Sequence, residues 1–226
     1  MTPTFDVVIP TLNAASSLAR TLAAVATSGA SSVTVCDGGS RDDSLAIARR
    51  SGAVVLTAPA GRGGQLAVGV TAGSAPWLLF LHADTVPSPG WVETVRNFMA
   101  SPVNAGKAGY FRLRFDTRDP RARRVERLAA WRCRTLGLPY GDQGLLIARA
   151  FYESLGGYRA LPLMEDVDIA RRIGRRNLVA LDADAVTSAR RYERDGWLQR
   201  PLRNLFCLAL FLAGVSPGIV ARLYGR

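Results

Sequence analysis

Short apolar segments alternate with amphipathic ones through the first third of this chain, and this alternation is the strongest constraint on its fold. The pattern predicts strands at residues 5–10, 33–36, 53–56 and 77–81. It predicts helices between them, at about 13–28, 42–50 and 63–72. Strands that alternate with helices at this spacing favour a parallel sheet covered on both faces. We therefore predict an α/β fold with a doubly wound, mostly parallel sheet that is flanked by helices.

The later part of the sequence continues this pattern less regularly and ends in an apolar segment. Helices are expected at 91–99 and 120–134 and up to Ile173, and strands at 108–115, 141–148 and 178–181. The apolar run 205–215 is too short for a bilayer span, which needs about 20 residues. It leaves three placements open: packing on the domain, lying on a membrane surface, or contacting a second subunit. We divide the chain into an α/β domain at 1–200 and an apolar and basic helical appendage at 201–226.

Composition excludes several classes of protein. The formal net charge is +11, but all of the basic residues except Lys107 are arginine, and no nucleic-acid-binding module is recognisable, so we expect no nucleic-acid partner. Three widely spaced cysteines form neither a disulfide framework nor a zinc motif. The N-terminal residues lack the pattern of a secretion signal. These features predict a cytoplasmic protein, with the inner face of the membrane as an alternative location.

An acidic residue follows the expected strand at 77–81. His82 and Asp84 come directly after the apolar residues, and the crevice at the carboxyl ends of such strands is where open α/β sheets bind ligands. A carboxylate at this position can hold a divalent metal ion against a phosphate. The alternative is that Asp84 caps the helix that follows. His82, the only histidine, is interpreted as a structural residue or as a neighbour of the metal rather than a hydrolytic residue.

Two glycine-rich turns follow other expected strands. Asp37 is followed by Gly38-Gly39-Ser40, where small residues let a ligand approach and the carboxylate can accept hydrogen bonds from a base or a ribose. Arg62 lies in the turn 61–65 at a helix start, where exposed amides and a guanidinium suit a diphosphate. Each turn also has a purely structural interpretation, as a helix cap or as a solvated loop. Neither has the spacing of a dinucleotide-binding motif or a P-loop.

Three acidic residues cluster at a predicted helix start. Glu165 and Asp166 are adjacent, so their side chains diverge by about 100° and cannot have the same role. We expect one of them to face the crevice as a general base. Asp168 is expected to point toward Arg171 or Arg172 on the same helix. The helix dipole alone also favours acidic residues at this position.

Taken together, these motifs resemble those of family-2 glycosyltransferases with the GT-A fold. The resemblance rests on Val8-Ile9-Pro10-Thr11-Leu12-Asn13, Asp37-Gly38-Gly39-Ser40, His82-Ala83-Asp84-Thr85 and Glu165-Asp166, in that order. The chain is most similar to a short bacterial branch known as transferase 2, rSAM/selenodomain-associated. That branch also has turns like Gly61-Arg62-Gly63-Gly64-Gln65 and Gly141-Asp142-Gln143-Gly144.

The resemblance implies a role for each matching residue. It places the sugar-nucleotide donor against Pro10, Thr11, Asn13, Asp37, Gly39, Arg62, Gln65, Ala83 and Asp84. It makes Asp84 the last carboxylate of the metal-binding DxD element, and Asp166, with Glu165 beside it, the base of the ED element. Asp142 and Gln143 would lie on the acceptor side. His82 stands where many relatives have the first aspartate of DxD, which leaves Asp84 as the metal ligand.

The implied activity is that of a metal-dependent inverting glycosyltransferase that uses Mn²⁺ or Mg²⁺. It would move a sugar from a nucleoside-diphosphate donor, with uridine favoured, to an acceptor hydroxyl. The sequence does not identify the acceptor, and a lipid-linked acceptor is one alternative. The sequence also leaves open whether the chain forms a homo-oligomer. Two other functions remain: a nucleotidyltransferase acting on a sugar phosphate, and a non-catalytic module that binds sugar nucleotides.

Overall fold

The structure is a computed structural model that describes residues 3–225. Its α-helices are α1 (Ala15–Ala26), α2 (Ser44–Arg50), α3 (Arg62–Gly69), α4 (Trp91–Ala100), α5 (Pro120–Leu136), α6 (Arg149–Ser154), α7 (Glu165–Ile173), α8 (Arg190–Asp195), α9 (Gln199–Leu212) and α10 (Pro217–Tyr224). Its strands are β1 (Phe5–Thr11), β2 (Ser32–Asp37), β3 (Val54–Thr57), β4 (Trp77–Phe80), β5 (Thr85–Pro87), β6 (Ala108–Phe115), β7 (Leu145–Ala148) and β8 (Leu178–Thr187). Short 3₁₀ helices include Gly141–Gln143, just before β7.

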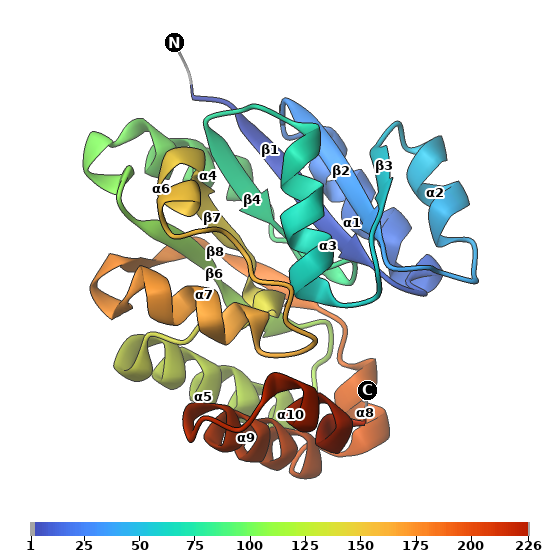
Figure 1. Cartoon of the computed structure of the whole chain (residues 1–226), viewed down its shortest axis with the longest axis vertical. Coiled ribbons are helices and arrows are strands. Elements are labelled where there is room, and N and C mark those ends of the chain that lie inside the picture. The colour runs from blue at the N-terminus through green and yellow to red at the C-terminus, as the bar shows by residue number, and fades with distance from the viewer. Residues whose placement is uncertain (1–2, 226) are drawn as a thin grey trace.

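The strands form one mixed sheet with helices on both sides (Figure 1). Among the described residues the strand order is β3-β2-β1-β4-β7-β6-β8-β5. The pairs β1–β2, β1–β4, β2–β3 and β6–β8 are parallel, whereas β7 runs antiparallel to both of its neighbours. Because β7 is reversed, its start lies at the same edge of the sheet as the ends of β1 and β4. This arrangement confirms the predicted α/β sheet and brings the loop before β7 to the ligand-binding edge.

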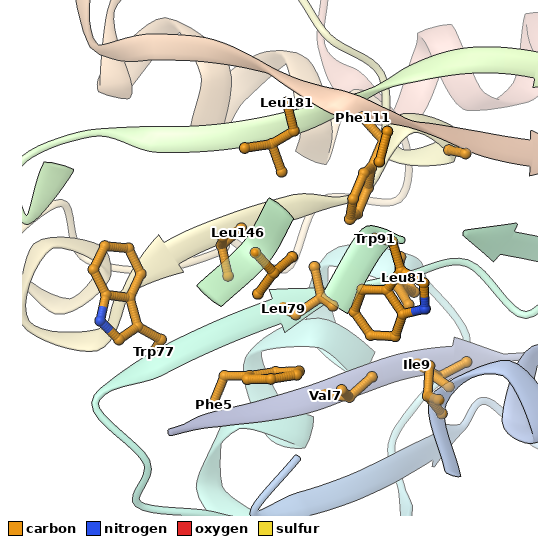
Figure 2. Packing of buried hydrophobic residues seen from close by; sticks show 14 of the residues in the cluster. Phe5, Val7, Ile9, Trp77, Leu79, Leu81, Trp91, Phe111, Leu146 and Leu181 are labelled. Carbon is orange, nitrogen blue, oxygen red and sulfur yellow. The ribbon is translucent and has the colours of Figure 1, made fainter. Parts of the chain in front are cut away.

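The central strands are buried on both faces because their apolar residues are nearly continuous. Val7 and Ile9 of β1 point into one core with Trp91 of α4 (Figure 2). Val8 points into the opposite core with Leu66 of α3. Successive residues of a strand point to opposite faces, so a continuous apolar run satisfies both layers. The sheet is thereby fixed between helices, and its carboxyl edge is a rigid platform.

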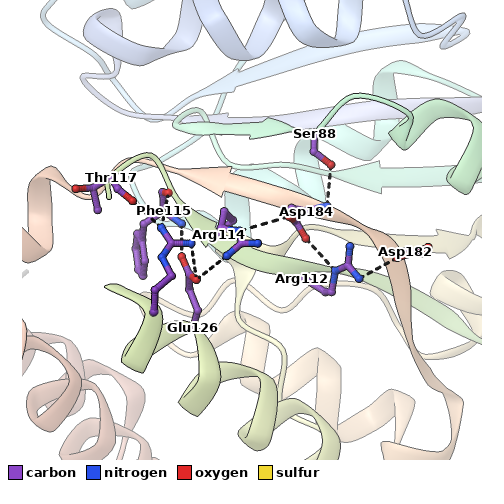
Figure 3. A network of polar contacts seen from close by, with 9 residues as sticks. Ser88, Arg112, Arg114, Phe115, Thr117, Glu126, Asp182 and Asp184 are labelled. Atoms are coloured by element: carbon purple, nitrogen blue, oxygen red, sulfur yellow. Dashed lines mark hydrogen bonds and ion pairs between the residues drawn. The ribbon is translucent and has the colours of Figure 1, made fainter. Parts of the chain in front are cut away.

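Ion pairs attach α5 to the sheet (Figure 3). Glu126 of α5 accepts a hydrogen bond from the backbone N–H of Phe115 at 2.8 Å and pairs with Arg114 at 3.2 Å. Asp184 of β8 pairs with Arg112 at 2.9 Å. Glu126 is almost fully buried, so its contacts compensate for the loss of its hydration. They fix the position of α5 relative to β6.

The C-terminal helices pack against α7, next to α5 at the lower end of Figure 1. Cys207 and Leu208 of α9 and Val220 of α10 are buried in a cluster with Val167 and Ala170 of α7. The sequence left three placements open for this segment, and in the structure it packs on the domain. The division at residue 200 stays a prediction; α9 itself begins at Gln199. Within residues 3–225, no helix combines the length and apolar character that a bilayer crossing requires.

Several local expectations were wrong. The helix expected at about 13–28 begins only at Ala15. Asn13 has φ +50°, and its side-chain oxygen accepts a hydrogen bond from the N–H of Arg41. The strand expected at 141–148 begins only at Leu145, and β8 extends to Thr187 instead of ending at Leu181. Strand β5 and helices α6 and α8 had no counterpart in the sequence prediction.

Candidate functional site

Two adjoining cavities open at the carboxyl edge of the sheet. The large cavity, of about 620 Å³, is lined by Pro10, Thr11, Leu12, Asn13, Ala14, Ser16, Ser17, Arg20, Ala60, Gly61, Arg62, Gln65, His82, Ala83, Asp84, Pro162, Ser188, Arg190, Arg191 and Ala221. The small cavity, of about 100 Å³, is lined by Arg62, His82, Asp84, Tyr140, Gly141, Asp142, Leu163, Met164, Asp166, Thr187, Ser188, Arg191, Tyr192, Arg200, Asn204 and Tyr224. Five residues, among them Arg62 and Asp84, line both cavities, which therefore adjoin.

Asp84 lies where the two cavities meet. Its side chain is partly exposed, and its Oδ2 lies 3.5 Å from an Nη of Arg191, which is itself half exposed. Helix α4 begins at Trp91 with Gly90 before it, so Asp84 does not cap that helix. The capping alternative is therefore excluded, and the Asp84 carboxylate is available to a ligand.

Asp166 also lines the small cavity. Its Oδ2 accepts a hydrogen bond from the N–H of Gly141 and its Oδ1 accepts one from Val167, each at 2.8 Å. A carboxylate oxygen has two acceptor positions, so each oxygen keeps one for a further donor. Gly141 is required at this point because a Cβ on it would collide with the ring of His82. The loop before β7 thus orients Asp166.

Glu165 lines neither of the two cavities. Its side chain is only 1% exposed, and its Oε1 lies 3.0 Å from the Nε of Arg62. Burial acts to lower the pKa of Arg62, but the charges of Glu165 and then Asp166 outweigh it and raise that pKa. Arg62 also lies 3.3 Å from the Nε2 of His82. Glu165 therefore holds a permanently charged arginine at the junction of the cavities.

Asp142 is a partly buried residue in the wall of the small cavity. Burial raises its pKa from 3.8 to about 6; the nearby Arg132 opposes this shift, while Asp166 and Asp84 add to it. Its Oδ1 is buried and has no hydrogen-bond partner among residues 3–225. A carboxyl group with a raised pKa and an unused oxygen is typical of a functional site.

Four of the residues expected at the site line neither cavity: three of them are buried, and Gly39 is exposed on the turn after β2. Asp37 is buried, and its Oδ2 accepts hydrogen bonds from Gly39 and Ser40, so it stabilises the turn after β2. Gln143 is buried, donates to the carbonyl of Phe111 and accepts from Arg132. Asp37, Gly39, Gln143 and Glu165 line neither cavity. Gln65 does reach the large cavity, although its amide donates to the carbonyls of Thr11 and Cys36.

The other expected residues come together at the cavities. Those that line at least one cavity are Pro10, Thr11, Asn13, Arg62, Gln65, His82, Ala83, Asp84, Asp142 and Asp166. As expected, Asp168 forms an ion pair with Arg172 on the same helix, α7. It also pairs with Arg159 at 3.0 Å.

Sequence reasoning missed the segment after β8 and the C-terminal helices as parts of the site. Ser188 and Arg191 follow β8 and line both cavities, and Asn204 of α9 and Tyr224 of α10 line the small one. The alternation of buried Leu181, Ala183, Ala185 and Thr187 was a signal that β8 continues to this edge. No comparable signal placed the C-terminal helices there.

Comparisons with known proteins are consistent with this geometry. The family model for Glycosyl transferase family 2 matches residues 6–154. The glucosyl-3-phosphoglycerate synthase of Mycobacterium tuberculosis, in complex with Mn²⁺ and uridine-diphosphate-glucose, is 19% identical, with a TM-score of 0.59 over 82% of this chain and 71% of that chain. The complex of that synthase with Mn²⁺, uridine-diphosphate and glucosyl-3-phosphoglycerate is 20% identical, with a TM-score of 0.57 over 79% and 69%. No curated protein sequence matches. At these identities the structural similarity shows the fold, which is the GT-A fold.

Proposed function

We propose, from the premise that this chain belongs to glycosyl transferase family 2, that it is a metal-dependent inverting glycosyltransferase acting on a nucleoside-diphosphate sugar. The observation that carries the proposal is that Asp84 and Asp166 line one small cavity, which adjoins a large cavity. The large cavity has a volume of about 620 Å³, within the usual range for small-molecule sites. The proposal puts the donor in the large cavity and the acceptor hydroxyl in the small one.

The donor's diphosphate would lie at the junction of the cavities. Arg62 is held there by Glu165, and Arg191 is exposed enough to turn toward a phosphate. Guanidinium groups bind phosphate oxygens through charge-assisted hydrogen bonds. Both arginines can therefore stabilise the negative charge that develops on the leaving diphosphate.

The residues present also fit a divalent cation bound together with a diphosphate. Described residues include no cluster of three His, Cys, Asp or Glu side chains able to hold a metal alone. Mg²⁺, however, is commonly bound by one or two carboxylates plus substrate phosphates and water. Asp84 would be the protein ligand. The Mycobacterium tuberculosis synthase has been crystallised with Mn²⁺ and with Mg²⁺ alongside uridine-diphosphate. Such an ion would add positive charge at the leaving group.

Asp166 is the proposed general base. It would take the proton from the acceptor hydroxyl as that oxygen attacks the anomeric carbon of the sugar. The bond from the anomeric carbon to the diphosphate oxygen breaks on the opposite side, and the nucleoside diphosphate leaves with the bonding electrons. One such displacement inverts the anomeric configuration. Gly141 keeps the carboxylate in place through its 2.8 Å hydrogen bond to Oδ2.

The experiment compares the wild type with Asp166→Asn. Sugar nucleotides with uridine, guanosine and thymidine diphosphate are supplied with Mn²⁺, and release of the nucleoside diphosphate is measured. We expect Asp166→Asn to lower turnover by about 100- to 10,000-fold, the usual contribution of a general base, and to leave thermal stabilisation by the nucleotide intact.

Asp43→Asn is the matched control, because Asp43 is an exposed carboxylate outside both cavities. Near-normal turnover by Asp166→Asn would refute its assignment as the base. Release of pyrophosphate from a nucleoside triphosphate would favour a nucleotidyltransferase instead. Tight binding of sugar nucleotides without any turnover would favour a non-catalytic module.

A further inference from the structure

A third cavity, of about 200 Å³, lies between α5 and α9, and its lining is mostly apolar. We call it the apolar cavity; it is lined by Leu113, Val125, Leu128, Ala129, Trp131, Arg132, Leu136, Tyr140, Asp142, Tyr192, Pro201, Asn204, Leu205 and Leu208. Neither the glycosyl donor nor the proposed mechanism uses it. Its position relative to the small cavity nevertheless suggests a role.

The apolar cavity adjoins the small cavity at a polar junction. Four residues line both cavities: Tyr140, Asp142, Tyr192 and Asn204. Arg132 stacks on the ring of Tyr140, with its guanidinium carbon 3.3 Å from the ring centroid. A ligand that occupies the apolar cavity would therefore have one end at this junction, beside the cavity that contains Asp166.

Two oxygen atoms at the junction lack partners. The Oδ1 of Asp142 and the Oδ1 of Asn204 are both buried, and neither has a hydrogen-bond partner within residues 3–225. A buried acceptor without a donor is costly, and native proteins rarely leave one unexplained. A hydroxyl group on a ligand could donate to one of these two oxygens on binding, before its proton passes to Asp166 in the proposed reaction. The junction thus favours a ligand whose polar end is a hydroxyl-bearing group.

The other end of the apolar cavity is open to the surface. Leu128, Trp131 and Leu136 of α5 are at least half exposed, and Leu205 of α9 is 60% exposed. Exposed apolar side chains that cluster around a cavity mark a binding site more often than a solvated surface. An apolar chain can therefore enter between the two helices without passing through the donor cavity.

We propose that the acceptor is an amphiphilic alcohol whose apolar chain lies in the cavity between α5 and α9 and whose hydroxyl reaches the junction beside Asp142 and Asn204. This inference rests on the proposed function, because it assigns the acceptor of that reaction. It predicts that acceptor binding depends on the length of the apolar chain. Burial of one methylene contributes about 0.8 kcal/mol, so each additional methylene should tighten binding about fourfold while room remains.

The first experiment measures binding without a donor. A straight-chain primary alcohol with a terminal bromine is titrated into the protein, because bromine quenches the fluorescence of a tryptophan that it contacts. We expect saturable quenching that Trp131→Phe abolishes and that the unbrominated alcohol reverses by competition. Leu205→Gln should weaken binding about fivefold, since it replaces an apolar wall of the cavity. Leu202→Gln is the matched control, because Leu202 is similarly exposed on α9 and does not line the cavity.

The outcomes separate this inference from the proposed function. Quenching that does not saturate, or that Leu202→Gln weakens as much as Leu205→Gln, would overturn the acceptor site. So would a stable dimer in sedimentation that Leu205→Gln dissociates, because a second copy would then cover the apolar face. Binding of the alcohol that survives Asp166→Asn supports the site even if that variant keeps its turnover and so refutes the assignment of the base. Transfer of sugar to the long alcohol, but not to phosphoglyceric acid, would support both.

Discussion

Asp142→Asn should stabilise the protein at alkaline pH, because it removes a charge from a partly buried carboxyl group whose Oδ1 is buried and has no partner within residues 3–225. Burial raises the pKa of Asp142 from 3.8 to about 6, so the folded protein binds this proton more tightly than the unfolded chain does. As the pH rises from about 4 to 6, the unfolded chain loses its proton first, and the free energy of unfolding falls. Above pH 6 the folded protein carries the charge as well, and the loss is complete.

The magnitude follows from the difference between the two pKa values. One pKa unit corresponds to 1.36 kcal/mol, so a difference of about 2 units destabilises the folded state by about 3 kcal/mol at pH 8. At pH 5 the folded carboxyl is still mostly protonated, and the cost is about half as large. Asp142→Asn, which is neutral at every pH, should therefore raise the free energy of unfolding by about 3 kcal/mol at pH 8 and by about half of that at pH 5.

Urea denaturation at the two pH values, with EDTA present to exclude metal ions, measures this difference. Asp43→Asn serves as the control, because Asp43 is exposed and its charge is hydrated in both states. A gain that is the same at pH 5 and pH 8 would show that Asp142→Asn acts through packing and not through charge. A loss of stability at pH 8 would show that the carboxylate is compensated in the folded state, which would refute the argument from burial.

Three further predictions concern the framework of the site. Gly141→Ala should lower turnover, because its Cβ would collide with the ring of His82. Adding His82→Ala should restore part of the lost turnover. Kinetics of the two single variants and of the double variant test this coupling. Asp168→Ala should destabilise the fold by about 3 kcal/mol in urea denaturation, because it leaves the partly buried Arg172 without its carboxylate partner. An effect below about 1 kcal/mol would mean that this ion pair is solvated. Leu79→Ala should cost about 2–5 kcal/mol in the same assay, since Leu79 is fully buried in the central strand β4, and a smaller cost would mean that the core collapses around the gap.

The strands at the start of the sheet were predictable because burial on both faces leaves a strong mark in the sequence. β1 and β4 are nearly unbroken apolar runs, and their ends agree with the prediction within one residue. β8 was predicted too short because Asp182 and Asp184 interrupt its apolar residues. These two side chains lie on the face that pairs with arginines of β6, so the alternation signals a half-exposed strand and not its end.

The candidate site was predictable where a residue's role follows from its position at a strand end. Asp84 follows β4, and Arg62 begins α3. Both lie at the junction of the cavities. Asp37 also ends a strand, but its carboxylate turns inward and accepts hydrogen bonds from the N–H groups of Gly39 and Ser40. Asp37 and Asp84 both lie at or just after the end of a strand. The direction of the side chain, which decides whether it meets a ligand, depends on local hydrogen bonds that a single sequence does not reveal.

The different roles of Glu165 and Asp166 illustrate how distant packing decides such a direction. Their divergence on a helix was predictable, but which one would face the cavity was not. Helix α7 is fixed in rotation because Ile169 packs against the sheet while Val167 packs against α9 and α10. With these two faces buried, Asp166 is left facing the small cavity, where it accepts a hydrogen bond from the loop before β7. The C-terminal helices therefore help to orient Asp166, the proposed base, as well as lining the small cavity. A domain boundary at residue 200 would place Asp166 in one domain and the helices that orient it in the other.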